Sequence, residues 1–163
     1  MPITPDMAVA LVRLPFTPLG PADWRDCRRA MPGHAYGPRV GFQHLLLAHV
    51  RTGADGQDQV LSVGTGTGSG AAEDPDRAVA HALSRMTALA ETAQPTYDGP
   101  WELEVCGSER ALRLVVLDDG QWSAFATDGG AALAVTGAGW PREGLALVAV
   151  DPFDYVDEVA DPV

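Results

Sequence analysis

The strongest constraint on the fold is a series of short apolar runs in the C-terminal part of the chain. Five runs follow one another from Trp101 onward: WELEVCG, RALRLVVLDD, QWSAFATD, AALAVTG and LALVAVD. The segments between them contain Ser-Glu, Asp-Gly and Gly-Gly pairs and a loop with glycine and proline, and such residues favour turns between antiparallel strands. We therefore expect a C-terminal meander of about five antiparallel strands.

The N-terminal part predicts further strands and one short helix. The apolar runs 42–51 and 59–63 flank TGADGQD, whose Asp-Gly pair is typical of a hairpin tip. A helix over 42–51 is the alternative, because a short apolar run fits both structures. Residues 7–16 alternate like a strand, and 21–31 predict a short helix with proline in its first turn and arginines at its end. The segment 31–41 is rich in glycine and proline and predicts a loop.

One long helix is predicted between these two parts. Asp74-Pro75-Asp76 supplies a helix cap, a proline at the first helical position and an acid in the first turn. The helix would continue to about Ala93 and end at Gln94-Pro95. Its apolar side chains recur at helical spacing: Val79, Leu83, Met86, Ala90 and Ala93.

Together these elements predict a single α+β domain over residues 1–163. Its mainly antiparallel sheet would contain the C-terminal meander, the N-terminal strand and the hairpin, with the long helix packed across one face and the short helix beside it. A chain of 163 residues is long enough to form one core. Residues 151–163 contain five acids, which is typical of a solvated C-terminal tail that frays.

The charge of the chain limits its chemistry and its partners. The net charge is -11, and all eleven basic residues are arginine. Without lysine, the chain has no catalytic lysine for a P-loop, a protein kinase or a Schiff base. The acid excess opposes direct binding to nucleic acid and attracts a basic partner protein instead. The chain contains no lysine and no asparagine, and it is rich in alanine and glycine. This composition indicates a GC-rich bacterial genome.

Membrane attachment, redox chemistry and metal binding are not expected. No apolar run is long enough to cross a bilayer, and the start of the chain does not resemble a signal peptide, so we expect a cytoplasmic protein. Cys27 and Cys106 are far apart in sequence and predict reduced thiols. His44 and His49 are five residues apart, a spacing that directs their side chains away from a common ion. We predict no metal site and no cofactor.

The glycine-rich segment SVGTGTGSGAAEDPD, residues 62–76, is the most motif-like stretch of the chain. A phosphate-binding loop needs free backbone amides at the start of a helix. Here the acids in residues 73–76 would repel a phosphate, so we interpret the glycines as a flexible joint or the loose end of an edge strand. An anion or nucleotide site at Gly66, Gly68 and Ser69 is the alternative.

No arrangement of residues predicts catalysis, and we assign no catalytic residue. We expect a non-enzymatic protein–protein interaction module, of a regulatory, adaptor or immunity type, that presents an acidic surface to a partner protein. A homo-oligomer belongs to the same class. The alternative is a small-molecule-binding protein or a small enzyme with a pocket between helix and sheet, near Cys106, His44, His49 or His81.

Two groups of residues are candidates for contact with the partner. Trp140 and Arg142 lie together in a predicted loop, and these residue types are enriched in interface hot spots. The alternative for Trp140 is that it caps the end of the sheet. The second group, Arg77, His81 and Arg85, recurs one turn apart on the solvent side of the predicted long helix.

Overall fold

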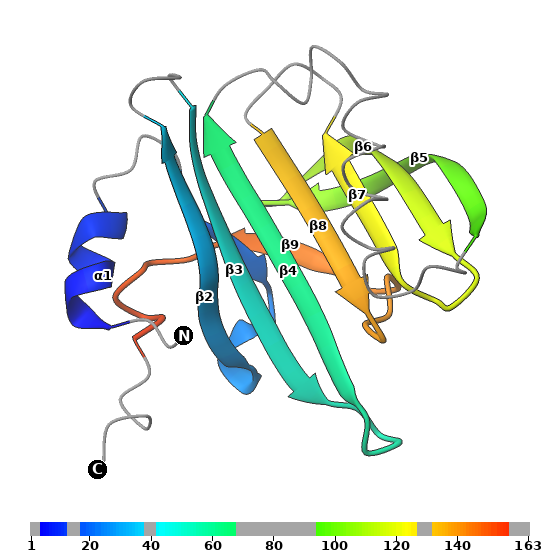
Figure 1. The fold of residues 1–163 in the computed structure, drawn as a ribbon, viewed down its shortest axis with the longest axis horizontal. Helices are drawn as coiled ribbons and strands as arrows, with labels where there is room; N and C mark the ends of the chain where they lie inside the picture. The colour runs from blue at the N-terminus through cyan, green and yellow to red at the C-terminus, as the bar shows by residue number, and fades with distance from the viewer. Residues whose placement is uncertain (1–3, 13–16, 38–41, 68–93, 127–131, 157–163) are drawn as a thin grey trace.

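The described residues of this computed structural model, 4–12, 17–37, 42–67, 94–126 and 132–156, form one curled nine-stranded sheet (Figure 1). The strand order is β1-β9-β5-β6-β7-β8-β4-β3-β2. The strands are β1 (Leu19–Pro21), β2 (Arg28–Gly37), β3 (Phe42–Thr52), β4 (Asp58–Thr67), β5 (Pro95–Val105), β6 (Ser108–Leu117), β7 (Trp122–Ala126), β8 (Ala132–Ala138) and β9 (Ala146–Ala149). Two short helical elements are described beside them, α1 (Pro5–Leu11) and the 3-10 turn η1 (Trp24–Asp26).

The two groups of strands predicted from turn signals are confirmed. β3 and β4 form the N-terminal hairpin, and β5 to β8 are neighbours in chain order, as in a meander. Gly56 and Gly120 adopt positive φ values of 79° and 87° in two of the connecting turns, which is the reason that Asp-Gly marks them correctly. The fifth C-terminal strand departs from a meander, because β9 crosses to the far side of β5 and pairs with it in parallel.

The prediction of an α+β domain is wrong. The described chain is nearly all strand, in a mixed sheet. The first residues of the strand predicted over 7–16 lie in the helix α1, which Pro5 and Asp6 begin, and residues 13–16 lie outside the described part of the chain. The only helical element within the short helix predicted over 21–31 is the turn η1, because β2 begins at Arg28 and its pairing with β3 outweighs the local helix signals. β2 also includes residues 31–37 of the loop that was predicted over 31–41.

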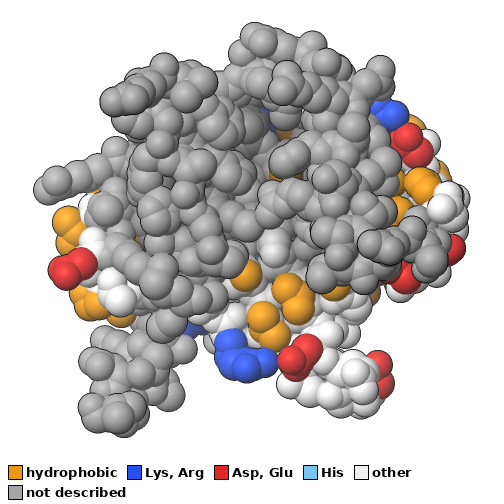
Figure 2. Space-filling model, viewed as in Figure 1, with side chains coloured by type: hydrophobic (Ala, Val, Ile, Leu, Met, Phe, Trp, Pro, Cys, Tyr) orange, Lys and Arg blue, Asp and Glu red, His pale blue; other side chains and the backbone are white. Residues whose placement is uncertain are grey.

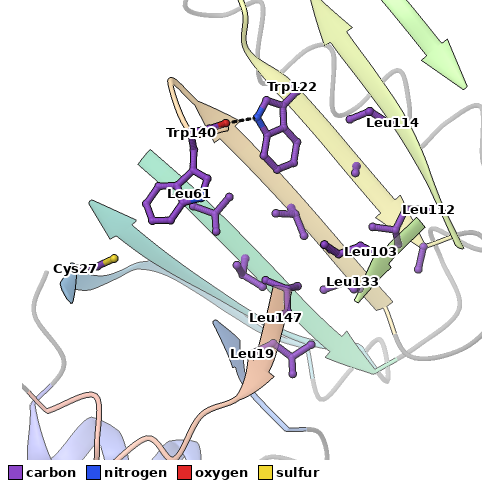
Figure 3. Packing of buried hydrophobic residues seen from close by; sticks show 14 residues of the cluster. Leu19, Cys27, Leu61, Leu103, Leu112, Leu114, Trp122, Leu133, Trp140 and Leu147 are labelled. Carbon is purple, nitrogen blue, oxygen red and sulfur yellow. Dashed lines mark hydrogen bonds between the residues drawn. The ribbon is translucent and has the colours of Figure 1, made fainter. Parts of the chain in front are cut away.

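The long helix predicted over 74–93 lies outside the described residues, which end at 67 and resume at 94. The described part of the chain has a hydrophobic core of its own. The sheet curls over this core, because β1 lies against β3 and β4 and pairs with β9 (Figure 1). Leu19 of β1 and Leu147 of β9 belong to the same buried cluster as Leu61 of β4 and Leu133 of β8 (Figure 3). Burial of each such leucine contributes about 1.5–3 kcal/mol.

Tyr155 anchors the segment that follows β9. Its ring lies 4.7 Å from that of Trp24, centroid to centroid, and its hydroxyl lies 2.5 Å from Nε2 of His49. Both Tyr155 and His49 are almost completely buried. Gly20 of β1 makes room for the hydroxyl group, since a Cβ atom at that position would overlap it. We call Gly20, Trp24, His49 and Tyr155 the C-terminal clasp.

The neighbours of His49 define its protonation state. Nδ1 lies 3.3 Å from the carbonyl oxygen of Leu61, which can only accept, so Nδ1 carries the hydrogen. Nε2 is then the acceptor, and the Tyr155 hydroxyl donates to it. Burial lowers the pKa of His49 to about 4 and raises the pKa of Tyr155 above its usual value. Both partners are therefore neutral at physiological pH.

The acidic tail expected over 151–163 is packed at its beginning. Pro152 and Tyr155 are buried, whereas Asp151, Phe153 and Asp154 are exposed. Residues 157–163 lie outside the described part of the chain. The acids that suggested a solvated tail therefore flank the residue that anchors this segment.

Replacing Tyr155 by phenylalanine is expected to lower the free energy of unfolding by about 1–3 kcal/mol, because it leaves the buried Nε2 of His49 without a donor. Urea denaturation measures the change. Tyr97→Phe is the matched control, since the Tyr97 hydroxyl donates to the Pro100 carbonyl but the side chain is exposed. We expect less than about 0.5 kcal/mol there. Equal effects in the two variants would contradict the clasp.

Stability is expected to fall in mild acid because His49 is buried in its neutral form. Its pKa is lowered from 6.5 to about 4, so between these values the unfolded chain binds a proton that the folded chain does not. The contribution of neutral His49 to the free energy of unfolding is complete above its pKa in the unfolded chain, 6.5. It is lost as the pH falls toward its pKa in the folded chain, about 4. It amounts to roughly 3 kcal/mol.

Two measurements test this pH dependence. Urea denaturation between about pH 6.5 and pH 5 isolates the histidine, since unperturbed carboxylates titrate lower. An NMR titration should find one imidazole with a pKa about 4, whose signal is missing from His49→Gln. A His49 imidazole that titrates near its ordinary value would contradict the prediction.

Candidate functional site

The larger of two described hollows lies at one end of the curled sheet. It is lined by Gln59 of β4, Trp101 of β5, Trp122 of β7, the turn glycine before β7, and residues 139–143 between β8 and β9. Its volume is about 590 Å³, and it is open to solvent. We call this hollow the tryptophan groove. It contains both residues of the loop pair proposed from the sequence, Trp140 and Arg142.

Trp122 forms the rigid floor of the tryptophan groove. It is 1% exposed, and its Nε1 donates a hydrogen bond of 2.8 Å to the carbonyl of Trp140 (Figure 3). Its cross-strand partner is Gly137 of β8, where a Cβ atom would overlap the indole ring. The ring of Trp101 meets it edge to face at 5.5 Å, a favoured arrangement of two aromatic rings.

Trp140 is held by an arginine stacked on its ring. The Cζ atom of Arg51 lies 3.7 Å from the ring centroid, and its Nε donates to Oε1 of Gln59 at 2.7 Å. The same guanidinium forms an ion pair with Asp23. Trp140 is only 4% exposed, so its side chain packs at the end of the sheet, and little of it is open to a partner.

Arg142, in contrast, has donors available to a ligand. Its guanidinium lies 5.9 Å from the ring centroid of Trp122, and the side chain is partly exposed. Trp101 is partly exposed as well. Within the described parts of the chain, neither Arg142 nor the indole N–H of Trp101 has a hydrogen-bond partner. Pro141 and Glu143 form the exposed rim.

An acidic strip lies on the outer face of the β5–β6 hairpin. Glu104 of β5 stands directly opposite Glu109 of β6, and Glu102 is two residues away on the same face. All three are exposed. Hydrogen bonding to Glu102 and repulsion from it raise the pKa of Glu109. Figure 2 shows carboxylates beside hydrophobic side chains at the right-hand edge, where β5 begins and β6 ends, away from the turn beside Glu104 and Glu109. A cationic partner would relieve this repulsion.

Asp98 and Arg113 on the same hairpin are arranged differently. Nε and Nη2 of Arg113 each donate to one carboxylate oxygen of Asp98 at 2.9 Å. This two-point contact lowers the pKa of Asp98. The charge of Asp98 is thus neutralised within the chain, and the acidic strip consists of the three glutamates alone.

The described beginning of the glycine-rich segment, residues 62–67, differs from both interpretations given for the segment. Residues 62–67 continue β4, a strand with neighbours on both sides, so they are neither a flexible joint nor a sheet edge. Gly66 pairs with His44 of β3 and with Ala132 of β8. Ladder bonds on both sides outweigh the weak strand preference of glycine. Gly68 and Ser69 lie outside the described residues, as do Arg77, His81 and Arg85.

The cysteines and His49 do not form a shared site. Cys27 is buried, and burial raises the pKa of its thiol, whereas Cys106 is exposed in the turn between β5 and β6. His49 belongs to the C-terminal clasp. Across the described ranges, no group of three or more histidines, cysteines or acids is arranged to hold a metal. No helix in those ranges has the length and apolarity needed to cross a membrane.

Sequence reasoning missed Trp101 and Trp122 as groove residues. Four tryptophans in 163 residues were the available signal, since three of them line this one hollow. Comparison of the chain with protein-family models, with curated proteins and with solved structures finds no match. The candidate site is therefore argued from its geometry alone.

Gly137→Ala is expected to displace Trp122 and destabilise the protein by about 1–3 kcal/mol, because the added Cβ atom overlaps the indole ring. Tryptophan fluorescence and near-UV circular dichroism report the displacement, and urea denaturation reports the stability. Ala134→Ser is the control, because Ala134 lies on the same strand with an exposed side chain. An unchanged spectrum in Gly137→Ala would show that Trp122 does not depend on this close approach.

Proposed function

We propose that the chain is a non-enzymatic protein–protein interaction module whose tryptophan groove contacts a basic partner protein. The observation that carries the proposal is a pair of partly exposed side chains, Arg142 and Trp101, which lie beside aromatic rings in an open groove and have no hydrogen-bond partner among the described residues. Tryptophan and arginine are the residue types enriched where interfaces concentrate their binding energy. Trp122 and Trp140 hold this surface rigid, which reduces the entropy lost on binding.

Charge supports a basic partner. The chain carries a net charge of -11, and the acidic strip of Glu102, Glu104 and Glu109 lies on β5, which also carries Trp101, and on its neighbour β6. Complementary charge speeds association and suppresses wrong partners more than it raises affinity. The strip would therefore guide the partner, and the groove would hold it.

Three buried side chains of types that can carry catalysis, His49, Tyr155 and Cys27, are poorly placed for it. His49 and Tyr155 are buried, neutral and hydrogen-bonded to each other, and Cys27 is buried with a raised pKa. A general acid or base must reach its substrate and titrate near the working pH. None of these three groups meets both conditions.

Arg142→Ala is expected to weaken partner binding by about 10-fold or more. The wild-type chain would be isolated gently at low salt from the cells that encode it, and its complex examined by native mass spectrometry. The captured protein would then be purified and titrated with each variant. Arg25→Ala is the matched control, because Arg25 also stacks on a tryptophan, Trp24, at 4.4 Å, but outside the groove.

Three results would contradict the proposal. The first is a partner that binds both variants as tightly as the wild type. The second is a homo-oligomer, which would make a second copy the partner in place of a basic protein. The third is a lone chain that carries a small molecule. Trp140→Ala is unsuitable as a test, because a buried side chain of this size contributes to stability.

A further inference from the structure

We propose that Phe153 is an anchor residue that inserts into an apolar pocket of the partner protein, a pocket with basic residues at its rim. Phe153 follows β9 in a turn formed by residues 151–156, which we call the phenylalanine turn. None of these residues lines the tryptophan groove. The inference rests on the proposed function in taking the partner to be a basic protein, and it adds a second point of contact.

Phe153 is a large apolar residue that the fold leaves exposed. It is 49% exposed, whereas Pro152 before it and Tyr155 after it are buried. Single apolar side chains do lie on protein surfaces, so exposure alone does not mark a binding site. Phe153 differs from them in two respects, because hydrogen bonds fix the backbone around it and acidic residues flank it in the turn.

The hydrogen bonds of the phenylalanine turn involve both peptide groups of Phe153. Its N–H donates to Oδ1 of Asp151 at 2.9 Å, and its carbonyl oxygen accepts from the N–H of Val156 at 3.3 Å. The N–H of Asp154 donates to the Asp151 carbonyl at 2.9 Å. Tyr155 is in turn held by the C-terminal clasp. A side chain presented by an ordered backbone loses less conformational entropy on binding than one on a free loop.

Two carboxylates accompany the ring. Asp151 and Asp154 are both exposed, and within the described ranges of the chain neither forms an ion pair. Aromatic residues are enriched at the buried centres of protein interfaces, and charged residues lie at the rims. The phenylalanine turn has this composition, with acids at its rim. The complementary surface is therefore an apolar pocket surrounded by arginine or lysine.

The net charge of the chain selects among possible occupants. A second copy of the chain carries the same charge of -11 and would be repelled. An anionic lipid surface would be repelled in the same way. A basic protein is attracted, so it is the occupant that the acids of the turn and of the whole chain favour.

The first test compares variants of the full chain in titrations with the captured and purified partner. Phe153→Ala should weaken binding by about 10-fold or more, since it removes the anchor. Its urea midpoint should stay at the wild-type value, because an exposed side chain contributes little to stability. Tyr97→Ala is the matched control, since Tyr97 is an aromatic residue of similar exposure, 45%, on β5. It should bind as the wild type does.

The second test removes one charge of the phenylalanine turn. Asp151→Asn keeps a side-chain oxygen that accepts from the Phe153 N–H, so the turn is retained. We expect an association rate about 3-fold lower at low salt, with a weaker dependence on salt. Asp55→Asn is the matched control, because Oδ1 of this exposed residue also accepts from an N–H two residues on, that of Gln57, at 3.0 Å.

The third test locates the pocket on the partner. The photoreactive residue p-benzoylphenylalanine takes the place of Phe153, and the cross-linked peptides are identified by mass spectrometry. We expect cross-links to apolar residues of the partner that lie beside arginine or lysine. The same photoreactive residue at Tyr97 should give no such cross-link.

Four results would overturn the inference. They are wild-type binding by Phe153→Ala, equal weakening by Tyr97→Ala, cross-links from position 153 to a second copy of the chain, and capture of no basic protein. The proposed function is judged separately by Arg142→Ala. If that variant binds weakly and Phe153→Ala binds normally, the groove stands and the anchor is refuted. The opposite pair of results would uphold the anchor and refute the groove.

Discussion

The hydrogen bond between Tyr155 and His49 holds the curled sheet closed. His49 belongs to β3, near one end of the strand order, whereas Tyr155 follows β9, near the other. β1, which pairs with β9, shields the core from water only while it lies against β3 and β4. Both partners of the bond are neutral, so no charge is buried, and the ring of Trp24 covers the phenol. The closed curl in turn encloses the core leucines.

The geometry of the tryptophan groove follows from this closure. Asp23 precedes Trp24 of the clasp, and it pairs with Arg51, whose guanidinium stacks on Trp140. The carbonyl of Trp140 then fixes Trp122, and Trp122 positions the ring of Trp101. A continuous series of contacts thus runs from the clasp to the groove. A change that opens the clasp would disturb the groove without touching a residue that lines it.

Local signals in the sequence were sufficient for the hairpins but not for the way they assemble. Asp-Gly turns and apolar runs locate β3, β4 and β6 to β8 because neighbouring strands pair through short connections. β9 pairs with strands that are distant in sequence, β1 and β5. β2 pairs with the next strand, β3, but the glycines and prolines after residue 30 favour a loop, and the arginines and prolines near η1 fit a helix and a strand end equally well. Residue type singled out Arg142, whereas Trp101 and Trp122 resemble ordinary strand residues. Only the register that places Gly137 opposite Trp122 reveals the groove.

The tryptophans and the arginine of the groove have two separate roles, which follow from their burial and their hydrogen bonds. Trp122 and Trp140 bond to each other and are almost fully buried, so they determine shape and stability. Arg142 and Trp101 are partly exposed in the groove, so they determine which ligand is accepted. Substitutions of the first pair should therefore change folding, and those of the second pair should change recognition.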